Sequence, residues 1–385
     1  MTIDLDTIGL DQGGHLIIGR VLNQMHEGER VRITGSDPHL ELHLRVWARS
    51  RGHKAEGRWL IKGNVEKSRW NDAIRTSTEE PESSADATWG LSARGSLMET
   101  GGPPLVGHDL DEKIGLWADI APRLYAQAVS AQWDPNEAID WTLPTHPDHE
   151  VEDAVIQLMT YLIENEQAAL LVPAKFIGRI HPHYREILQL LAIQIADEAR
   201  HIEVFTRRAR ISGRPLGRSG VAGRASLQTL LEEPDYSLAS LLLSVLGEGT
   251  FLNLLSFIQR HAPDAITARI CELARRDEAR HVTFGLAHLE YRVQQEPSLR
   301  TRMFSAVEQR HESLRSTSGL SGDVFDALVI LAAGEWTPSA VRSGWSLVQE
   351  LQKEMDEGRR RRLTRLGFSG NEAAHLSSLH TRNFM

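Results

Sequence analysis

The chain has 385 residues, a formal charge of −9 and a pI of about 6.0. This length suggests two or three domains, and the acidic balance argues against a general nucleic-acid or anionic-membrane binder. A single cysteine, Cys271, excludes an intrachain disulfide and fits a reducing cytosol. We find no signal-peptide pattern and no apolar run near the roughly 18 residues that span a bilayer. We therefore expect a cytoplasmic protein that binds neither nucleic acid nor membranes.

Residues 1–70 alternate short apolar runs with amphipathic stretches. The pattern predicts two helices, His15–Met25 and His39–Arg51, and three strands, Thr2–Leu5, Arg30–Thr34 and Arg58–Lys62. The order β-α-β-α-β is typical of a small two-layer α/β domain.

Five short elements in this segment stand out: Asp6–Leu10, Gly28–Glu29, Ser36–Pro38, Trp47–Arg49 and Gly52–His53. Together they resemble the TusA-type sulfur-carrier family. That family carries a Cys-Pro pair where this chain has Gln12 and Gly13, and persulfide chemistry needs the thiol. The resemblance therefore implies a TusA-like domain without sulfur-transfer activity. It would serve for docking or for covering the other domain, or it would be a structural appendage only.

A polar stretch follows this domain. Residues Thr76–Thr88 are mainly Ser, Thr, Glu and Asp without apolar periodicity, and Gly101–Pro104 closes the region. Such a composition predicts a linker or surface loop over residues 71–106. We expect a metal-binding helix bundle over 107–300 and a C-terminal helical extension over 301–385.

From residue 109 onward the pattern is almost wholly helical. Long helices with short connections favour an antiparallel bundle, and the longer connection at residues 213–237 suits a crossover between two helix pairs. The dense basic run Arg359–Arg362 predicts a solvated helix face rather than a phosphate site. The expected helices are Asp109–Gln132, Glu150–Val172, Tyr184–Ile211, Leu238–His261, Asp264–Gln295, Arg300–Ser316, Gly322–Ala333 and Ser339–Glu357.

One pentapeptide, Asp-Glu-Ala-Arg-His, occurs twice in this helical part, at Asp197–His201 and Asp277–His281. Its Glu and His are three residues apart, so a helix projects both from one face. A lone Glu-x-x-His is usually a solvated ion pair. Two copies, each preceded by a helix with a Glu in an apolar stripe, instead match the ligand pattern of di-iron and di-manganese bundles.

The remaining ligands come from the preceding helices. Glu248 lies in an apolar stripe and must therefore be paired, neutral or metal-bound. In the first pair, the helical neighbours of Glu166 are apolar, whereas those of Glu164 are more polar. Glu166 is thus favoured, and Glu164 stays open as the alternative. The predicted metal-binding and catalytic set is Glu166, Glu198, His201, Glu248, Glu278 and His281.

Charged residues within the pentapeptides predict a supporting layer. A metal-bound His commonly donates its other ring N–H to a carboxylate, so Asp197 and Asp277 would each reach the His of the opposite helix. Arg200 and Arg280 would then pair with these carboxylates, the alternative being surface ion pairs. For His288 we expect a place in the core or at its rim. The aromatic element Tyr125–Trp141 is expected to pack in the core.

The doubled motif and its glutamates resemble the ferritin-like di-iron carboxylate superfamily, over about residues 115–295. The Asp-Glu-x-Arg-His form is similar to O2-activating members such as acyl-carrier desaturases, ribonucleotide reductase small subunits and arylamine N-oxygenases. The resemblance implies a mainly α fold: a ferritin-like antiparallel helix bundle with extra helices, preceded by the α/β domain. It also implies two iron ions, with manganese or a mixed Fe/Mn pair as alternatives.

The same resemblance implies an oxidase or monooxygenase that uses O2 and a small organic substrate. Electrons would come from a separate donor, because the sequence has no flavin or nicotinamide motif. Two other functions stay open: a ferroxidase or metal-handling protein, and a partner-binding protein with a structural di-metal site. A homodimer is compatible with a large helical bundle.

Overall fold

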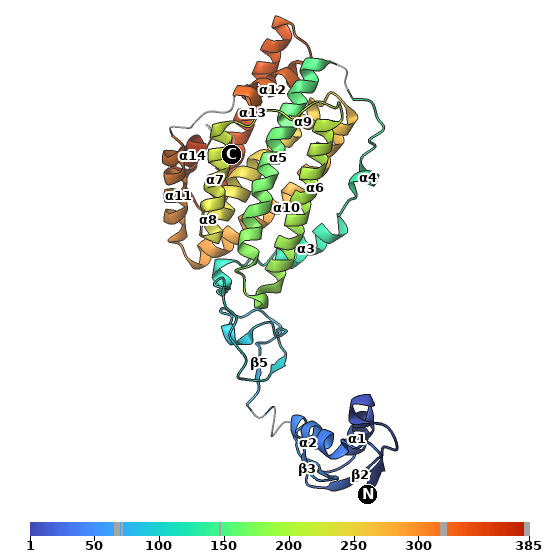
Figure 1. Ribbon diagram of the computed structural model, residues 1–385. Helices are drawn as coiled ribbons and strands as arrows, with labels where there is room; N and C mark the ends of the chain where they lie inside the picture. The colour runs from blue at the N-terminus through green and yellow to red at the C-terminus, as the bar shows by residue number, and fades with distance from the viewer. Residues whose placement is uncertain (65–69, 71, 146–147, 316–321, 381–385) are drawn as a thin grey trace. The chain divides into compact units, whose positions relative to one another are not determined.

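The computed structural model describes the chain except for residues 65–69, 71, 146–147, 316–321 and 381–385 (Figure 1). The chain divides into two compact units. The first holds residues 1–82 and 86–105, and the second holds residues 83–85 and 106–385.

The first unit begins with a four-stranded sheet and two helices. In the sheet order β1-β2-β4-β3, β1 runs parallel to β2, and the other two pairs are antiparallel. The expected two-layer α/β fold is confirmed, with one strand more than expected. The extra strand, β3, has three residues without a fully buried side chain, so no apolar pattern marks it. The bounds are β1 Thr2–Asp4, α1 Gly14–Leu22, β2 Arg30–Thr34, α2 Leu40–Ser50, β3 Lys54–Glu56 and β4 Trp59–Ile61.

One face of this sheet carries the core of the domain. Val31 and Ile33 alternate with more exposed residues along β2, so only one face of the strand is buried. They join one hydrophobic cluster with Ile18 of α1 and Leu40 and Leu44 of α2. Both helices therefore cover the buried face of the sheet.

The stretch expected as linker contains short ordered elements. Strands β5 (Ile74–Arg75) and β6 (Leu97–Met98) pair antiparallel, and a 3-10 turn, η2, covers Ala87–Trp89. Thr76 is buried, and its hydroxyl donates to the carbonyl of Ala93 at 2.7 Å. Turns and hydrogen bonds order this region without a hydrophobic period.

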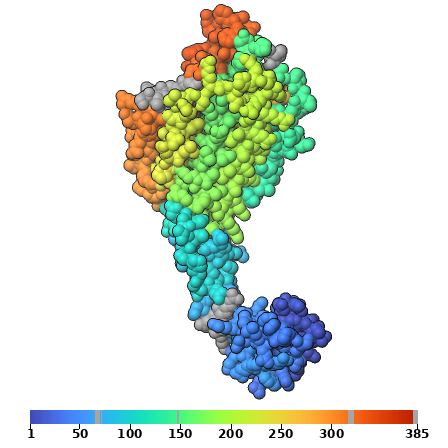
Figure 2. Space-filling view, in the orientation of Figure 1, coloured from blue at the N-terminus to red at the C-terminus, as the bar shows by residue number. Residues whose placement is uncertain are grey.

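The second unit is helical, as expected. Helix α5 packs along α6, and α10 packs along both η5 and α9, while α12 lies against α5 and α13 (Figure 1). The side chains of α5 and α6 form a close-packed surface in the space-filling view (Figure 2). The bounds are η3 Lys113–Gly115, α3 Ala121–Ser130, α4 Pro135–Ala138, α5 His149–Ile177, η4 Pro182–Tyr184, α6 Arg185–Arg210, α7 Val221–Glu232, α8 Tyr236–Ser240, η5 Leu241–Glu248, α9 Gly249–Arg260, α10 Ala265–Gln295, α11 Leu299–Leu314, α12 Gly322–Ala333, α13 Pro338–Arg365 and α14 Gly370–His380.

Several helix ends differ from the prediction. The expected helix from Asp109 is irregular until α3 begins at Ala121, where Pro122 suits the first turn and not a helix interior. Helix α5 continues through Pro173 to Ile177, since packing in the core outweighs the lost hydrogen bond. Helix α13 likewise continues past its expected end at residue 357. Helices α7 and α14 were not expected.

The basic run of α13 was predicted to be solvated, and this is wrong for Arg359. Its side chain is 1% exposed and donates to the hydroxyls of Ser377 at 3.0 Å and Thr250 at 3.3 Å. Arg362 is partly buried, and its Nε donates to the carbonyl of Val245 at 2.6 Å. Only Arg360 and Arg361 match the expected exposed face.

The segment Tyr236–Arg260 is long and apolar enough to cross a membrane by length and composition. From the sequence we expected no apolar run near this length, so this segment is a difference from the prediction. Helices α12 and α13 pass the same criterion only when counted as one span, although they meet at 117°. Most of Tyr236–Arg260 is buried in the helical unit, which accounts for its composition as a core helix.

A buried ion-pair network fixes three helices of the bundle. Arg208 of α6 donates two hydrogen bonds of 2.8 Å to the carboxylate of Glu152 on α5. It also donates to Asp264 at 2.7 Å and to Thr267 at 2.7 Å, and Asp264 caps the start of α10. The planar guanidinium suits such bidentate contacts. The network therefore sets the relative register of α5, α6 and α10.

The middle of the segment Tyr236–Arg260 is a π-helix, η5, rather than an α-helix. Such i→i+5 stretches are rare and are frequent at functional sites. Gly285 of α10 faces this stretch: a Cβ at Gly285 would overlap the Cβ of Ser244 and lie 2.9 Å from its hydroxyl. The missing side chain thus lets α10 approach η5 closely.

This close approach generates a prediction. Gly285→Ala should lower the free energy of unfolding by about 1–3 kcal/mol, since the new methyl group has no room. The matched control Gly223→Ala lies in helix α7 with no atom within 4 Å of the new methyl group. It should raise stability by about 0.5–1 kcal/mol, as is usual for Gly to Ala in a helix. Denaturant unfolding of the two variants measures this, and equal shifts would contradict the close packing.

Candidate metal centre

Six side chains from four helical segments meet in one buried cluster. Glu166 comes from α5, the first Glu-x-x-His pair from α6, Glu248 from η5 and the second pair from α10. Their ligand atoms form two groups of four, each within 4.8 Å: Glu166, Glu198, His201 and Glu278, and Glu198, Glu248, Glu278 and His281. None is more than 4% exposed. Glu198 and Glu278 belong to both groups, so the cluster can hold two adjacent metal ions.

Several of these atoms lack a hydrogen-bond partner although they are buried. They are Glu166 Oε1, Glu198 Oε1, Glu248 Oε2, Glu278 Oε2 and His281 Nδ1. His281 Nδ1 and Glu198 Oε1 lie 3.0 Å apart, but their orientation makes no hydrogen bond. A buried polar atom without a partner is costly, and a cation where these lone pairs converge removes that cost. The residues therefore fit a pair of metal ions.

A second layer of charge surrounds the two imidazoles. His201 Nε2 lies 3.2 Å from Asp277 Oδ2, and His281 Nε2 lies 3.3 Å from Asp197 Oδ2. Each Asp thus accepts from the His of the opposite helix. With Nε2 as the donor in both rings, Nδ1 keeps its lone pair for a metal.

The two arginines of the pentapeptides connect these aspartates. Arg200 pairs with Asp197 and lies 3.1 Å from Asp277, and Arg280 pairs with Asp277 and lies 3.2 Å from Asp197. Both arginines are at most 13% exposed, so they are not surface ion pairs. The cross-linked carboxylates hold α6 and α10 together behind the cluster.

Two residues of this layer were not predicted to take part. Trp133 Nε1 donates to Asp277 Oδ2 at 2.8 Å, and the Arg200 guanidinium lies over the Trp133 ring at 4.6 Å. Gln132 Nε2 donates to Asp197 Oδ1 at 2.9 Å. Their aromatic and polar character stood out in the sequence, but nothing local to residues 132–133 indicates an aspartate partner on another helix.

The charge of the cluster calls for cations. With both imidazoles neutral, four glutamates, two aspartates and two arginines carry a formal charge of minus four. This is the charge that two divalent cations neutralise. Burial in a low-dielectric interior makes an unbalanced charge of this size costly.

Without metal, this excess negative charge shifts the pKa values of the glutamates and histidines in the cluster. Burial, and then repulsion by Glu198 and Glu278, raises the pKa of Glu166, and burial with repulsion by Glu278 raises that of Glu248. Burial opposes ionisation of Glu198, but the two imidazoles lower its pKa well below the usual range. Burial likewise opposes protonation of His201 and His281, yet the surrounding carboxylates raise both pKa values. Protons thus stand in for cations in the metal-free chain.

Glu164, the alternative to Glu166, lies outside the cluster. It is half-buried, and burial raises its pKa, while a hydrogen bond from Ser219 and the charge of Arg224 oppose that shift. Among the described residues, neither group of candidate ligands includes Glu164. The geometry therefore brings Glu166, and not Glu164, to the other five side chains.

His288 is a core histidine. Its Nδ1 lies 3.1 Å from the carbonyl of Trp117, and its Nε2 lies 2.7 Å from the hydroxyl of Ser237. Burial, with Arg292 nearby, lowers its pKa to about 4, so the ring is neutral at neutral pH. As expected, it stands apart from the candidate ligands.

A small cavity opens beside the cluster, between α5 and η5. It measures about 20 Å³, which is room for about one water-sized molecule. The carboxylates of Glu166, Glu248 and Glu278 face it, and its other walls include the apolar side chains of Leu243 and Phe251. The cluster thus has one small open side with a partly apolar lining.

No family model matches the chain, and no curated protein sequence matches it. Among solved structures, the chain is similar to an R2-like ligand-binding oxidase with a reconstituted Mn/Fe cofactor, at 17% identity over 69% of this chain and 91% of that chain, with a TM-score of 0.45. It is also similar to a protein with aldehyde deformylating oxidase activity from Synechococcus, at 18% identity over 60% and 96% of the two chains, with a TM-score of 0.43. At this level of similarity, function has to be inferred from the side chains of the chain itself.

The ligand assignment predicts a difference between two neighbouring glutamates. Glu166→Gln removes a charged donor from the cluster and should lower the bound metal from about two ions per chain to about one. Glu164→Gln changes the same functional group two residues away and should leave both ions bound. Metal analysis after anaerobic Fe(II) loading and desalting measures this. The reverse result would assign Glu164 as the ligand.

Proposed function

We propose that this chain is an O2-activating di-iron oxidoreductase, an oxidase or monooxygenase that acts on a small organic substrate. The single observation that carries the proposal is the buried cluster of four glutamates and two histidines with unpartnered ligand atoms. Glu166, Glu198, His201, Glu248, Glu278 and His281 are the proposed ligands.

The donor set favours iron or manganese. Carboxylate oxygen and imidazole nitrogen are hard or borderline donors, which suit iron and manganese better than thiolate-binding metals. The cluster has no sulfur ligand, since Cys271, the one cysteine, belongs to neither ligand group. Manganese or a mixed Fe/Mn pair would use the same six side chains. A reduced pair of such ions supplies electrons to O2 when it is bound.

The residues of the chain have three tasks in this proposal. Asp197 and Asp277 hold the imidazole N–H groups and so orient the ring nitrogens that bind metal. Arg200 and Arg280 offset the charge of these aspartates. Burial keeps bulk water from the cluster, which strengthens every charge interaction inside it.

The small cavity supports reaction with a gas molecule. Its volume of about 20 Å³ suits O2 or water, and its walls include Ala169, Leu243 and Phe251. An organic substrate would therefore present a narrow apolar group to the cluster, or the π-helical segment beside the cavity would have to move. Electrons would come from a separate donor, because the chain has no flavin or nicotinamide motif.

The metal ligands and the proposed oxidation both belong to residues 107–300. The segment at residues 1–70 would be a TusA-like accessory domain, since Gln12 and Gly13 occupy the Cys-Pro positions of that family and form the turn that starts α1. The chain would work in the cytoplasm, and it would need no nucleic acid or membrane.

The test is the reaction of the iron-loaded chain with O2. The chain is loaded anaerobically with Fe(II), freed of unbound metal and mixed with O2 in a stopped-flow spectrometer. We expect about two irons per chain, O2 consumption and a transient visible absorption. Zn(II)-loaded protein is the matched control, because zinc occupies carboxylate and imidazole sites without redox chemistry.

Other outcomes separate the alternatives. Iron oxidation that continues over many equivalents and releases ferric iron would support a ferroxidase or metal-handling protein instead. Two bound ions without any reaction with O2 would support a structural site. A chain that binds no iron would contradict the proposal altogether.

A further inference from the structure

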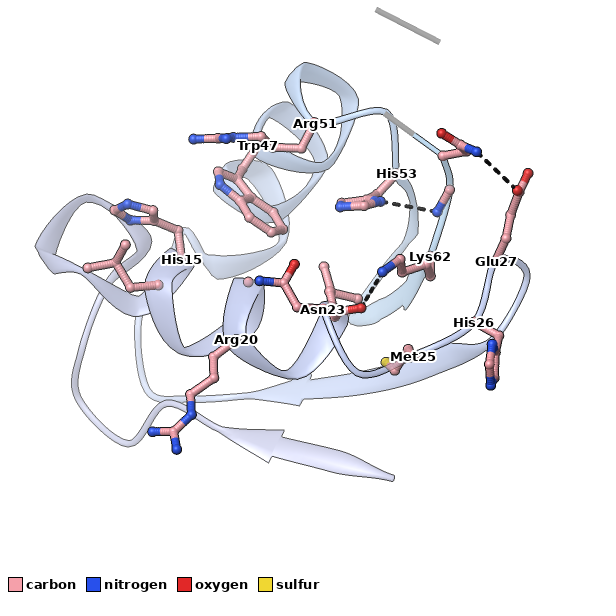
Figure 3. Close-up of a pocket in the computed structure, with 15 residues that line it drawn as sticks. His15, Arg20, Asn23, Met25, His26, Glu27, Trp47, Arg51, His53 and Lys62 are labelled. Atoms are coloured by element: carbon pink, nitrogen blue, oxygen red, sulfur yellow. Dashed lines mark hydrogen bonds between the residues drawn. The ribbon is translucent and has the colours of Figure 1, made fainter. Parts of the chain in front are cut away.

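A second cavity lies within the α/β domain, far along the chain from the metal ligands. It has a volume of about 830 Å³ and lies between the helices α1 and α2 and the chain segments 24–27 and 62–64 (Figure 3). Cavities of roughly 300–1,000 Å³ are typical of small-molecule sites. Every lining residue lies in residues 15–64, so the cavity belongs to one domain.

The walls of this cavity are rich in hydrogen-bond donors. Three permanently basic side chains and three histidines line it, against one carboxylate, Glu27, which accepts from Asn64 Nδ2 at 3.5 Å. The domain differs in charge from the rest of the chain. Residues 1–64 carry nine Lys and Arg against eight Asp and Glu, whereas residues 65–385 carry 34 against 44. The basic residues on the wall are His15, Arg20, His26, Arg51, His53 and Lys62.

Several of these donors are available for a ligand. Among the described residues the Arg51 guanidinium makes no ion pair or hydrogen bond, and in Figure 3 it extends beside the Trp47 ring. Lys62 Nζ donates to the carbonyl of Leu22 at the end of α1, which leaves further N–H groups on the ammonium. The Asn23 amide points toward the same space (Figure 3).

His53 adds a neutral donor. Its Nδ1 accepts from the backbone N–H of Gly63 at 3.1 Å, so the proton of the neutral ring is on Nε2. Burial, with the charges of Lys62 and Arg51, lowers its pKa and keeps the ring neutral at neutral pH. The His53 ring lies 5.9 Å from the Trp47 ring, and together they form an aromatic wall. Trp47 Nε1 is buried and has no hydrogen-bond partner.

We propose that this cavity binds a small organic molecule that carries an oxyanion next to a flat ring, as in an aryl carboxylate or a mononucleotide. The oxyanion would accept from Arg51, Lys62 and His53, and the ring would pack against Trp47. Charge-assisted hydrogen bonds to guanidinium and ammonium groups are the strong contacts for such an anion. This proposal does not depend on the metal centre.

Titration of the full chain labelled with 15N-tryptophan tests it. The chain has nine tryptophans, and the indole N–H signal of Trp47 is assigned as the one that Trp47→Phe removes. The probes are benzoate and adenosine monophosphate, with benzyl alcohol as the uncharged comparison, all at constant ionic strength. We expect the Trp47 signal to shift saturably with both anions, and more weakly with the alcohol. No saturable shift with either anion would overturn the proposal.

Three variants identify the binding surface. Arg51→Gln should weaken binding about tenfold or more, as expected for loss of a charged hydrogen bond. Arg49→Gln removes the same charge two residues earlier, on α2, but Arg49 is exposed and does not line the cavity, so binding should persist. Gly19→Phe fills the cavity from α1, where no atom lies within 4 Å of the new Cβ, and should abolish binding.

Two results would contradict this binding site. Equal weakening by Arg51→Gln and Arg49→Gln would mean general charge attraction, and unchanged binding by Gly19→Phe would place the ligand elsewhere. Either outcome would overturn the site. Unfolding curves of each variant establish that the chain remains folded, and loading the chain with metal should leave the titration unchanged.

Discussion

The excess negative charge at the centre of the helix bundle is the constraint on which this structure depends. Four glutamates and two aspartates are buried there, and among the described residues two arginines and two imidazoles lie against them. Such a group is unstable unless cations or protons balance it. The surrounding architecture holds the carboxylates together in spite of their repulsion. Arg200 and Arg280 link α6 to α10, and Arg208 fixes α5 and the start of α10.

Helix geometry turns this charge into a site with two positions. The pseudo-symmetric Glu-x-x-His pairs supply Glu198 and Glu278, which belong to both groups of ligand atoms. The other two glutamates come from different backbone conformations. Glu166 lies on a regular α-helix, whereas Glu248 ends a π-helix that packs closely on α10 at Gly285. The unequal surroundings leave a cavity on one side of the cluster, where a small molecule can approach the carboxylates.

Sequence patterns within a single helix predicted which candidate ligands point into the bundle. The i, i+3 spacing of each Glu-x-x-His pair and the apolar neighbours of Glu166 predict which side chains turn inward, and the structure brings these side chains together. Periodicity also indicated Glu248, although its segment is π-helical, because most residues around it in the sequence are apolar. The contacts of Trp133 and Gln132 with the aspartates join residues 65 to 144 positions apart, and no local pattern encodes them.

The same distinction applies to the fold. Strong periodicity predicted the long helices. Composition, however, indicated that α5 ends at Pro173 and that Arg359 is solvated, whereas packing keeps α5 helical past Pro173 and buries Arg359. The short strand β3 and helix α7 have too little apolar pattern to stand out. The most direct test of the account is anomalous diffraction from crystals soaked anaerobically with Fe(II), measured on both sides of the iron absorption edge. We predict two anomalous peaks about 3.5–4 Å apart within the cluster of six side chains, and a cluster without any peak would contradict the di-metal site.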